Sequence, residues 1–166
     1  MKLTDIMPLE KWVEFEKEIN KRFSLNASVF DVDGLRISKF VSWANRLCPA
    51  IKATSKGQTF ICSAAHQNVA KRAENSGKSI VDECDAGLSK IVAPIFYKGE
   101  FLGAVGGCGL FLEGGEIDSF LVYKTTDIAE KEVEELSNDI GTIPASDVKS
   151  LTDFLEERLN TIVGNI

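Results

Sequence analysis

The sequence predicts a single α/β domain of the α+β kind, in which helices flank an antiparallel sheet. Two observations support this fold class. Short runs rich in β-branched and aromatic residues alternate with turn signals in the middle of the chain, and segments with apolar residues at helical spacing lie on both sides of them. The 166 residues, 44% of them hydrophobic, are enough for one core, and no low-complexity linker divides them.

We expect one domain over residues 1–166, with an N-terminal helix at about 8–23, a core at about 24–140 and a C-terminal helix at about 145–163. Pro8 stands where the first turn of a helix tolerates proline, and apolar residues follow it at helical spacing. This pattern predicts an amphipathic first helix.

Helical spacing also predicts a long helix at 58–76, for which Gly77 is a plausible C-terminal stop. Two shorter helices are expected at roughly 116–124 and 128–138. The C-terminal helix has an apolar stripe that either packs in the core or forms a docking or dimerisation face for a protein partner. Its members are Val148, Leu151, Leu155, Leu159 and Ile162.

Strand signals occupy the middle of the chain. The segment "ASVFDVDGLRIS" contains Asp33-Gly34 between two apolar alternations, which is a strong hairpin signal. The segments "KSIVDEC", "KIVAPIFY" and "EFLGAVGGCG" follow as strands, with Lys98-Gly99 as the turn between the last two. Together they predict an antiparallel meander.

The overall charge disfavours direct nucleic-acid binding. The formal net charge is −6, and no cluster of Lys and Arg of the kind that neutralises phosphates is present. No apolar run reaches the length of a signal peptide core or of a membrane span. We therefore expect a cytoplasmic protein that acts on neither nucleic acid nor membrane.

Four cysteines are the main chemical feature of the chain. In the predicted meander, Cys84 and Cys108 emerge at the same end of the sheet with one strand between them, so their backbones lie roughly 10 Å apart. That separation is too large for a disulfide, whose α carbons lie within about 7 Å. It suits thiolates that converge on a metal ion or a cluster.

The other two cysteines are expected at the same rim. Cys48 precedes a helix start at Pro49, where the helix dipole would stabilise a thiolate, and Cys62 lies on the helix that must cover the sheet. The sequence thus predicts a four-cysteine site for an iron–sulfur cluster or zinc. The spacing lacks the paired C-x2-C motifs of common metal sites, so burial of each cysteine as a small apolar residue stays open.

His66, the only histidine, follows Cys62 by one helical turn. It could bind the ligand, hydrogen-bond a ligating group, act as the base of a Cys/His pair, or simply be a partly exposed helix residue. The carboxylates of "DECD" should raise the pKa of the Cys84 thiol, which argues against cysteine catalysis there. We expect a protein without enzymatic activity.

The run "NRLCPAIKAT...GQTFICSAAH...ECDAGLSKIVAPIFYKGEFLGAVGGCG" resembles the PocR-type ligand-binding domain, a PAS-like sensory module of transcription regulators and signalling proteins. The similarity extends over about residues 20–140. In that family, cysteines stand before the first helix, in the next helix and at the start of a C-H-A-G-L motif, ahead of P-I and a G-G-Q strand end. The matching residues are Cys48, Cys62, Cys84, Ala86, Gly87, Leu88, Pro94, Ile95, Gly106 and Gly107.

The resemblance implies a PAS-like sheet and a regulatory domain that binds a small molecule, with hydrocarbon-derived compounds proposed for the family. It also places Asp85, Gly106 and Gly107 beside His66 as ligand-binding candidates. Asp85 stands where the family often has histidine, and Cys108 where it often has glutamine. These exchanges complete a four-thiolate set suited to a metal or cluster.

The sequence therefore favours a sensory module that signals redox or metal state to a partner. Two alternatives remain open. In one, the cysteines are structural and the domain senses a small organic ligand; in the other, the chain is a thiol-dependent enzyme that uses Cys62 or Cys84 with His66.

Overall fold

A computed structural model describes all residues, 1–166, and its centre is a four-stranded sheet. The strands are β1 (Asn26–Asp31), β2 (Ile80–Glu83), β3 (Ser89–Tyr97) and β4 (Glu100–Cys108), in the order β1-β4-β3-β2. Every neighbouring pair is antiparallel. The predicted α+β class, the meander and the tight turn between β3 and β4 are confirmed, and the architecture is PAS-like.

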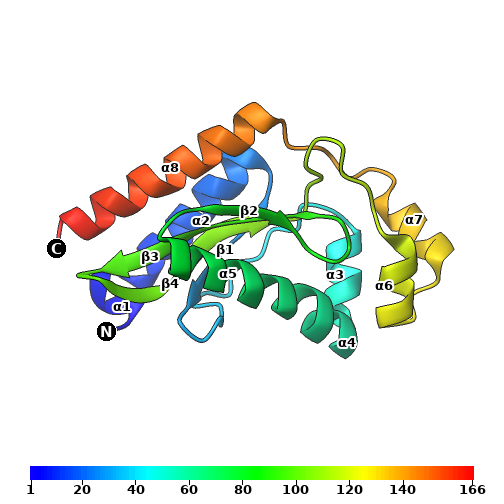
Figure 1. Cartoon of the computed structure of the whole chain (residues 1–166), viewed down its shortest axis with the longest axis horizontal. Helices are drawn as coiled ribbons and strands as arrows, with labels where there is room; N and C mark the ends of the chain where they lie inside the picture. The colour runs from blue at the N-terminus through cyan, green and yellow to red at the C-terminus, as the bar shows by residue number, and fades with distance from the viewer.

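One face of the sheet carries the main core. The helices α1 (Leu3–Ile6), α2 (Leu9–Phe23) and α8 (Ala145–Gly164) supply its other wall, and α8 runs beside α2 along the sheet (Figure 1). The sheet contributes alternate strand residues, as the two-residue repeat of a strand requires. They include Ala27, Val29, Ile91, Ala93 and Val105.

The apolar stripe of α8 belongs to this core. Leu151 and Leu155 are fully buried and Leu159 is 6% exposed. Of the two alternatives for this stripe, the structure shows core packing; a protein partner or a second copy bound through the rest of the C-terminal helix stays a prediction.

The opposite face is covered only in part. Helix α5 (Ala64–Ser76) packs Val69 and Ala73 against Val92 and Ala104 of the sheet. The helix predicted at 58–76 is divided, because its first residues form a π-helical segment, η1 (Gln58–Ser63). Its predicted stop is confirmed: Gly77 has a φ of 67°, a left-handed conformation in which glycine costs little.

Four short helices gather beyond the end of α5 (Figure 1). They are α3 (Leu47–Ala53), α4 (Ser55–Gly57), α6 (Ser119–Thr126) and α7 (Glu130–Ser137). The two helices expected at 116–124 and 128–138 are thus present with shorter bounds. This group has its own small apolar core, which contains Leu47, Ile51, Ile61, Ala86, Val122 and Val133.

The hairpin predicted at Asp33-Gly34 is reduced to a single bridge between Phe30 and Arg36. The reason is a buried carboxylate from α2. The Val29 amide donates to Glu16 Oε1 (2.9 Å), and the Ser38 hydroxyl donates to Glu16 Oε2 (2.6 Å). The Val29 amide at the outer edge of β1 is therefore not available to pair with a further strand. Residues 32–46 pass along this edge as an irregular segment.

None of the helices combines the length and the apolar character that crossing a membrane would require.

Candidate functional site

Helix α5 covers only part of its face of the sheet. A cavity of about 320 Å³ lies on the remaining part of that face. All four cysteines of the chain line it, each from a different element or connection. Polar, cationic and aromatic side chains complete the wall. The residues of the wall include Asn26, Phe30, Gly34, Arg36, Trp43, Lys52, Ser63, His66, Ser89, Lys90 and Gly109.

The register of the sheet places Cys108. It pairs directly with Asn26 of β1 on one side and with Lys90 of β3 on the other. Directly paired residues of antiparallel strands project to the same face. The three side chains therefore form one row across the sheet, and all three line the cavity.

Cys84 lies in the turn that follows β2. Its amide donates to the carbonyl of Leu88 (2.8 Å), and its own carbonyl accepts the amide of Gly87 (2.9 Å). Gly87 has a φ of 94°, and a β carbon there would lie 2.1 Å from the carbonyl oxygen of Glu116. This tight turn fixes Cys84 beside the sheet end.

Asn45 positions Cys48. The Asn45 side chain accepts the Cys48 amide (2.7 Å), approaches its Sγ with the amide nitrogen (3.2 Å), and donates to the Gly109 carbonyl (2.7 Å). One side chain thus joins the start of α3 to the end of β4. Cys62 reaches the cavity from η1, and π-helical turns of this kind recur at functional sites.

The surroundings of three of the thiols favour the neutral form. Burial raises the pKa of Cys48 and Cys84, and it raises the pKa of Cys62 to about 11. Neighbouring thiols add to this effect: Cys108 raises the pKa of the other three cysteines, Cys84 raises that of Cys48 and Cys62, and Cys62 raises that of Cys48. The four sulfur atoms are therefore neighbours around one space.

Two electrostatic expectations need correction. The helix dipole was expected to favour a Cys48 thiolate, but burial outweighs it and the pKa rises. The pKa of Cys84 is raised as expected, yet the cause is burial and not the adjacent carboxylates.

The cysteines form no disulfide. As arranged, no group of three or more His, Cys, Asp or Glu side chains is close enough to hold a single metal ion. The thiols line the wall of a space and do not meet at one point.

His66 is buried, with only 4% of its surface exposed, so the expectation of a partly exposed helix residue is wrong. Its ring stacks on Phe30, with 3.6 Å between centroids, and neither ring nitrogen has a hydrogen-bond partner. Burial, then the charges of Lys90 and Arg36, lower its pKa to about 3. A Cys/His catalytic pair needs an acidic thiol and a basic imidazole, and these groups are shifted in the opposite directions.

The cavity wall contains three cationic residues that the sequence did not predict to lie at the site: Arg36, Lys52 and Lys90. No Asp or Glu lines the cavity with them, and none of the three forms an ion pair. One signal was available. Lys90 is a single charge at the start of an apolar strand, and such residues are rarely buried without a partner.

Three predicted ligand-binding residues lie outside the cavity lining. Asp85 is exposed in the turn after β2. Gly106 and Gly107 serve close packing: a β carbon at Gly106 would lie 1.8 Å from the Ile91 carbonyl oxygen, and one at Gly107 would lie 2.7 Å from Leu25. Of the ligand-binding set, only His66 reaches the cavity.

A family model described as the sensory domain found in PocR matches residues 5–165. The chain belongs to the PocR sensory-domain family. Searches of curated proteins and of solved structures gave no match. Membership makes this a PocR sensory domain, and the cavity lined by the four cysteines offers a small molecule about 320 Å³ of space.

Proposed function

We propose that this PocR domain is a redox or iron sensor whose four cysteines bind a [4Fe–4S] cluster in the cavity. The observation that carries the proposal is the placement of the cysteines. Every cysteine of the chain lines the same cavity, although they come from α3, η1, the turn after β2 and the end of β4. Packing alone gives no reason for four separate segments to bring their only cysteines to one space.

The spread of the thiols favours a cluster over a single zinc ion. A tetrahedral zinc site with bonds of about 2.3 Å needs sulfur atoms roughly 3.8 Å from one another. No such group is formed. A cluster of four irons is itself a bulky body whose corners each take one thiolate, so it fits sulfur atoms arranged around the wall of a cavity.

The surroundings also suit an anionic cluster. Lys52 and Lys90 line the cavity with the thiols, and their charges act on Cys62 in the direction that lowers its pKa. Hydrogen bonds to the sulfurs and nearby charge are among the features that set cluster potential. The Asn45 amide beside Cys48 Sγ is one such contact.

The elements that carry the cysteines give a route to an output. Loss or oxidation of the cluster would release α3, η1 and the turn after β2 from a common anchor, while the core beneath α2 and α8 would stay intact. A protein partner that contacts the cysteine-bearing side would then distinguish the two states.

The test is anaerobic reconstitution of the full chain with ferrous iron and sulfide, followed by visible absorption and metal analysis. We expect a brown protein with a broad visible absorption band that arises from charge transfer between sulfur and iron. Cys108→Ser should lose most of this band. Ser63→Ala, a change in the same cavity wall, serves as the matched control and should keep the band.

A colourless, folded and metal-free protein after reconstitution would contradict the proposal and favour an organic ligand with structural cysteines. A colourless protein that retains zinc would replace the cluster by a zinc site. Rapid alkylation of Cys62 or Cys84 in the iron-free protein would instead support the thiol enzyme.

A further inference from the structure

The cavity has two ends. Asn26 and Phe30 lie on the same face of β1, four residues apart, which corresponds to about 13 Å along a strand. Asn26 stands in the row of Cys108. Phe30 marks the other end, where His66 stacks on its ring and Gly34 closes the wall.

Positive charge surrounds the Phe30 end. The Lys90 ammonium lies 4.8 Å from the centre of the Phe30 ring, and the guanidinium carbon of Arg36 lies 5.9 Å from it. Lys90 is only 8% exposed. No carboxylate lines the cavity beside these cations. The charge of Arg36 acts on the buried Glu16 carboxylate, which already accepts hydrogen bonds from Val29 and Ser38. Lys90 forms no ion pair, and buried charges in proteins are normally paired.

Hydrogen-bonding groups at this end also lack partners. Arg36 Nε and both ring nitrogens of His66 are buried and unbonded, although the other end of Arg36 donates to the Phe40 carbonyl (3.1 Å). Such atoms are rare in native proteins, and each one calls for a missing partner. A ligand oxyanion at this end would supply acceptors for Arg36 Nε, for the Lys90 ammonium and for the N–H of a neutral His66.

We infer that the Phe30 end of the cavity binds the oxyanion group, a carboxylate or a phosphate, of a small organic molecule. Arg36 and Lys90 bind the charge, His66 donates its ring N–H, and Phe30 and Trp43 contact the apolar body of the ligand. This site uses none of the four cysteines, but it shares Lys90 with the cluster surroundings, since Lys90 pairs with Cys108 in the sheet and its charge acts on Cys62.

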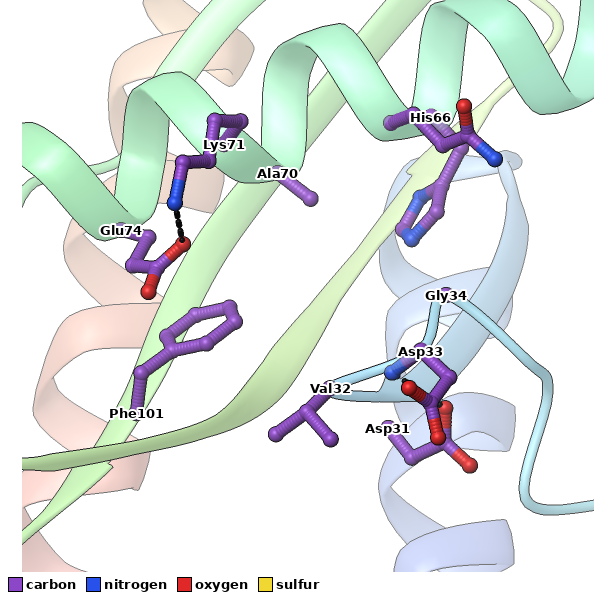
Figure 2. Close-up of a pocket in the computed structure, with 10 residues that line it drawn as sticks. Asp31, Val32, Asp33, Gly34, His66, Ala70, Lys71, Glu74 and Phe101 are labelled. Atoms are coloured by element: carbon purple, nitrogen blue, oxygen red, sulfur yellow. Dashed lines mark hydrogen bonds and ion pairs between the residues drawn. The ribbon is translucent and has the colours of Figure 1, made fainter.

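A neighbouring pocket shows that the charge pattern is local. Gly34 and His66 also line a second pocket of about 200 Å³, the outer pocket. Figure 2 shows the residues of this outer pocket. Its wall contains the carboxylates of Asp31, Asp33 and Glu74, and Glu74 pairs with Lys71 (2.8 Å). An oxyanion is therefore favoured in the inner cavity and repelled by the outer pocket.

The experiment measures binding to the full chain by isothermal titration calorimetry and by the shift of its melting temperature. The probes are benzoate, propionate and inorganic phosphate, with benzamide as a neutral molecule of the same shape as benzoate. The inference predicts that at least one anionic probe binds and raises the melting temperature, and that benzamide binds at least tenfold more weakly than benzoate.

Variants separate this site from the cluster. Arg36→Gln and Lys90→Met should each weaken the anionic probe at least tenfold, while Lys39→Gln, an exposed change of the same charge in the same segment, should not. Cys108→Ser should keep anion binding even where iron is lost, and Arg36→Gln should keep iron.

A preference for phosphate would identify a phosphate-bearing ligand, and a preference for benzoate or propionate would identify an organic acid; either result supports the inference. It would be overturned if no anionic probe binds, if benzamide binds as tightly as benzoate, or if Lys90→Met binds like the wild type. Should Arg36→Gln fail to fold, Lys90→Met decides alone, because methionine keeps the length and bulk of the side chain.

Discussion

At the scale of single residues, Lys90 shows where sequence reasoning stops. The run "KIVAPIFY" correctly predicts a strand, because β-branched residues and alternation determine it locally. Whether Lys90, the first residue of that run, points its ammonium into solvent or into a cavity depends on the helices that pack over it. The four cysteines could be read as a group from the sequence, whereas the cations beside them could not.

Lys90→Met provides the first prediction. Lys90 is buried without an ion pair, so replacing it with an apolar residue of similar shape should leave the free energy of unfolding of the empty domain unchanged or raise it by about 1 kcal/mol. Urea denaturation measures the change. Ile91→Ala, on the opposite face, should cost about 2–5 kcal/mol by opening a void in the main core. A comparable loss in Lys90→Met would mean that Lys90 has a structural role.

His66 provides a pH-dependent prediction. Because its pKa falls from 6.5 to about 3 in the folded state, only the unfolded chain binds a proton between these values. Stability contributed by the neutral ring is therefore complete above pH 6.5 and is lost as the pH falls toward 3, by up to about 1.4 kcal/mol per pH unit. In His66→Leu, the difference in unfolding free energy between pH 7 and pH 5 should be smaller than in the wild type. An equal difference in both proteins would refute the assignment of this pKa.

At the scale of elements, local patterns located the strands and most helices but missed two departures from regularity. The π-helical start of the segment at 58–76 cannot be seen in its apolar spacing; η1 contacts α3 and α4 in the folded chain. The second strand of the predicted hairpin at Asp33-Gly34 does not form, because the Val29 amide at the edge of β1 donates to Glu16 instead. Glu16 lies in α2, thirteen residues before Val29. Both features concern contacts between elements.

The same reasoning explains what was predictable about the site. In an antiparallel meander, successive strands run in opposite directions, so the first strand ends at the same edge of the sheet as the third. Cys84 and Cys108 could therefore be placed at the same end of the sheet from the sequence. Cys48 and Cys62 needed tertiary packing to be placed, and the hydrogen bonds of Asn45 that fix Cys48 connect residues far apart in sequence.

Glu16 gives a prediction at this scale. Glu16→Ala should lower the free energy of unfolding by about 2–3 kcal/mol, because it leaves the Val29 amide and the Ser38 hydroxyl without their acceptor. Burial raises the pKa of Glu16, so an uncharged replacement is well tolerated there. Glu16→Gln, which can accept from Val29 and donate to Ser38, should lose less than half as much in urea denaturation. Equal losses would show that the hydrogen bonds contribute little to holding the segment at 32–46.

At the scale of the whole molecule, the sheet separates two functions. The face that packs against α2 and α8 holds a continuous apolar core and keeps the domain folded. The other face has α5 at one end and the cavity at the other, with a thiol end and a cationic end. A family description alone identifies a sensor, and the arrangement of side chains in this cavity suggests what is sensed.

Hydrogen–deuterium exchange can follow this division. When the reconstituted cluster is removed by a chelator, exchange should accelerate in α3, η1 and the turn after β2, because these elements lose a common anchor. Helices α2 and α8 should change little. A uniform increase across both faces would indicate that the cluster supports the whole fold and not a local switch.

The most direct test of the central claim is the iron and acid-labile sulfide content of the protein purified anaerobically, without reconstitution, alongside the four single Cys→Ser variants. We expect about four irons and four sulfides per chain in the wild type, as a four-thiolate [4Fe–4S] site requires, with a marked loss in each variant. Folded wild-type protein that contains neither iron nor sulfide, and cannot be loaded with them, would contradict it.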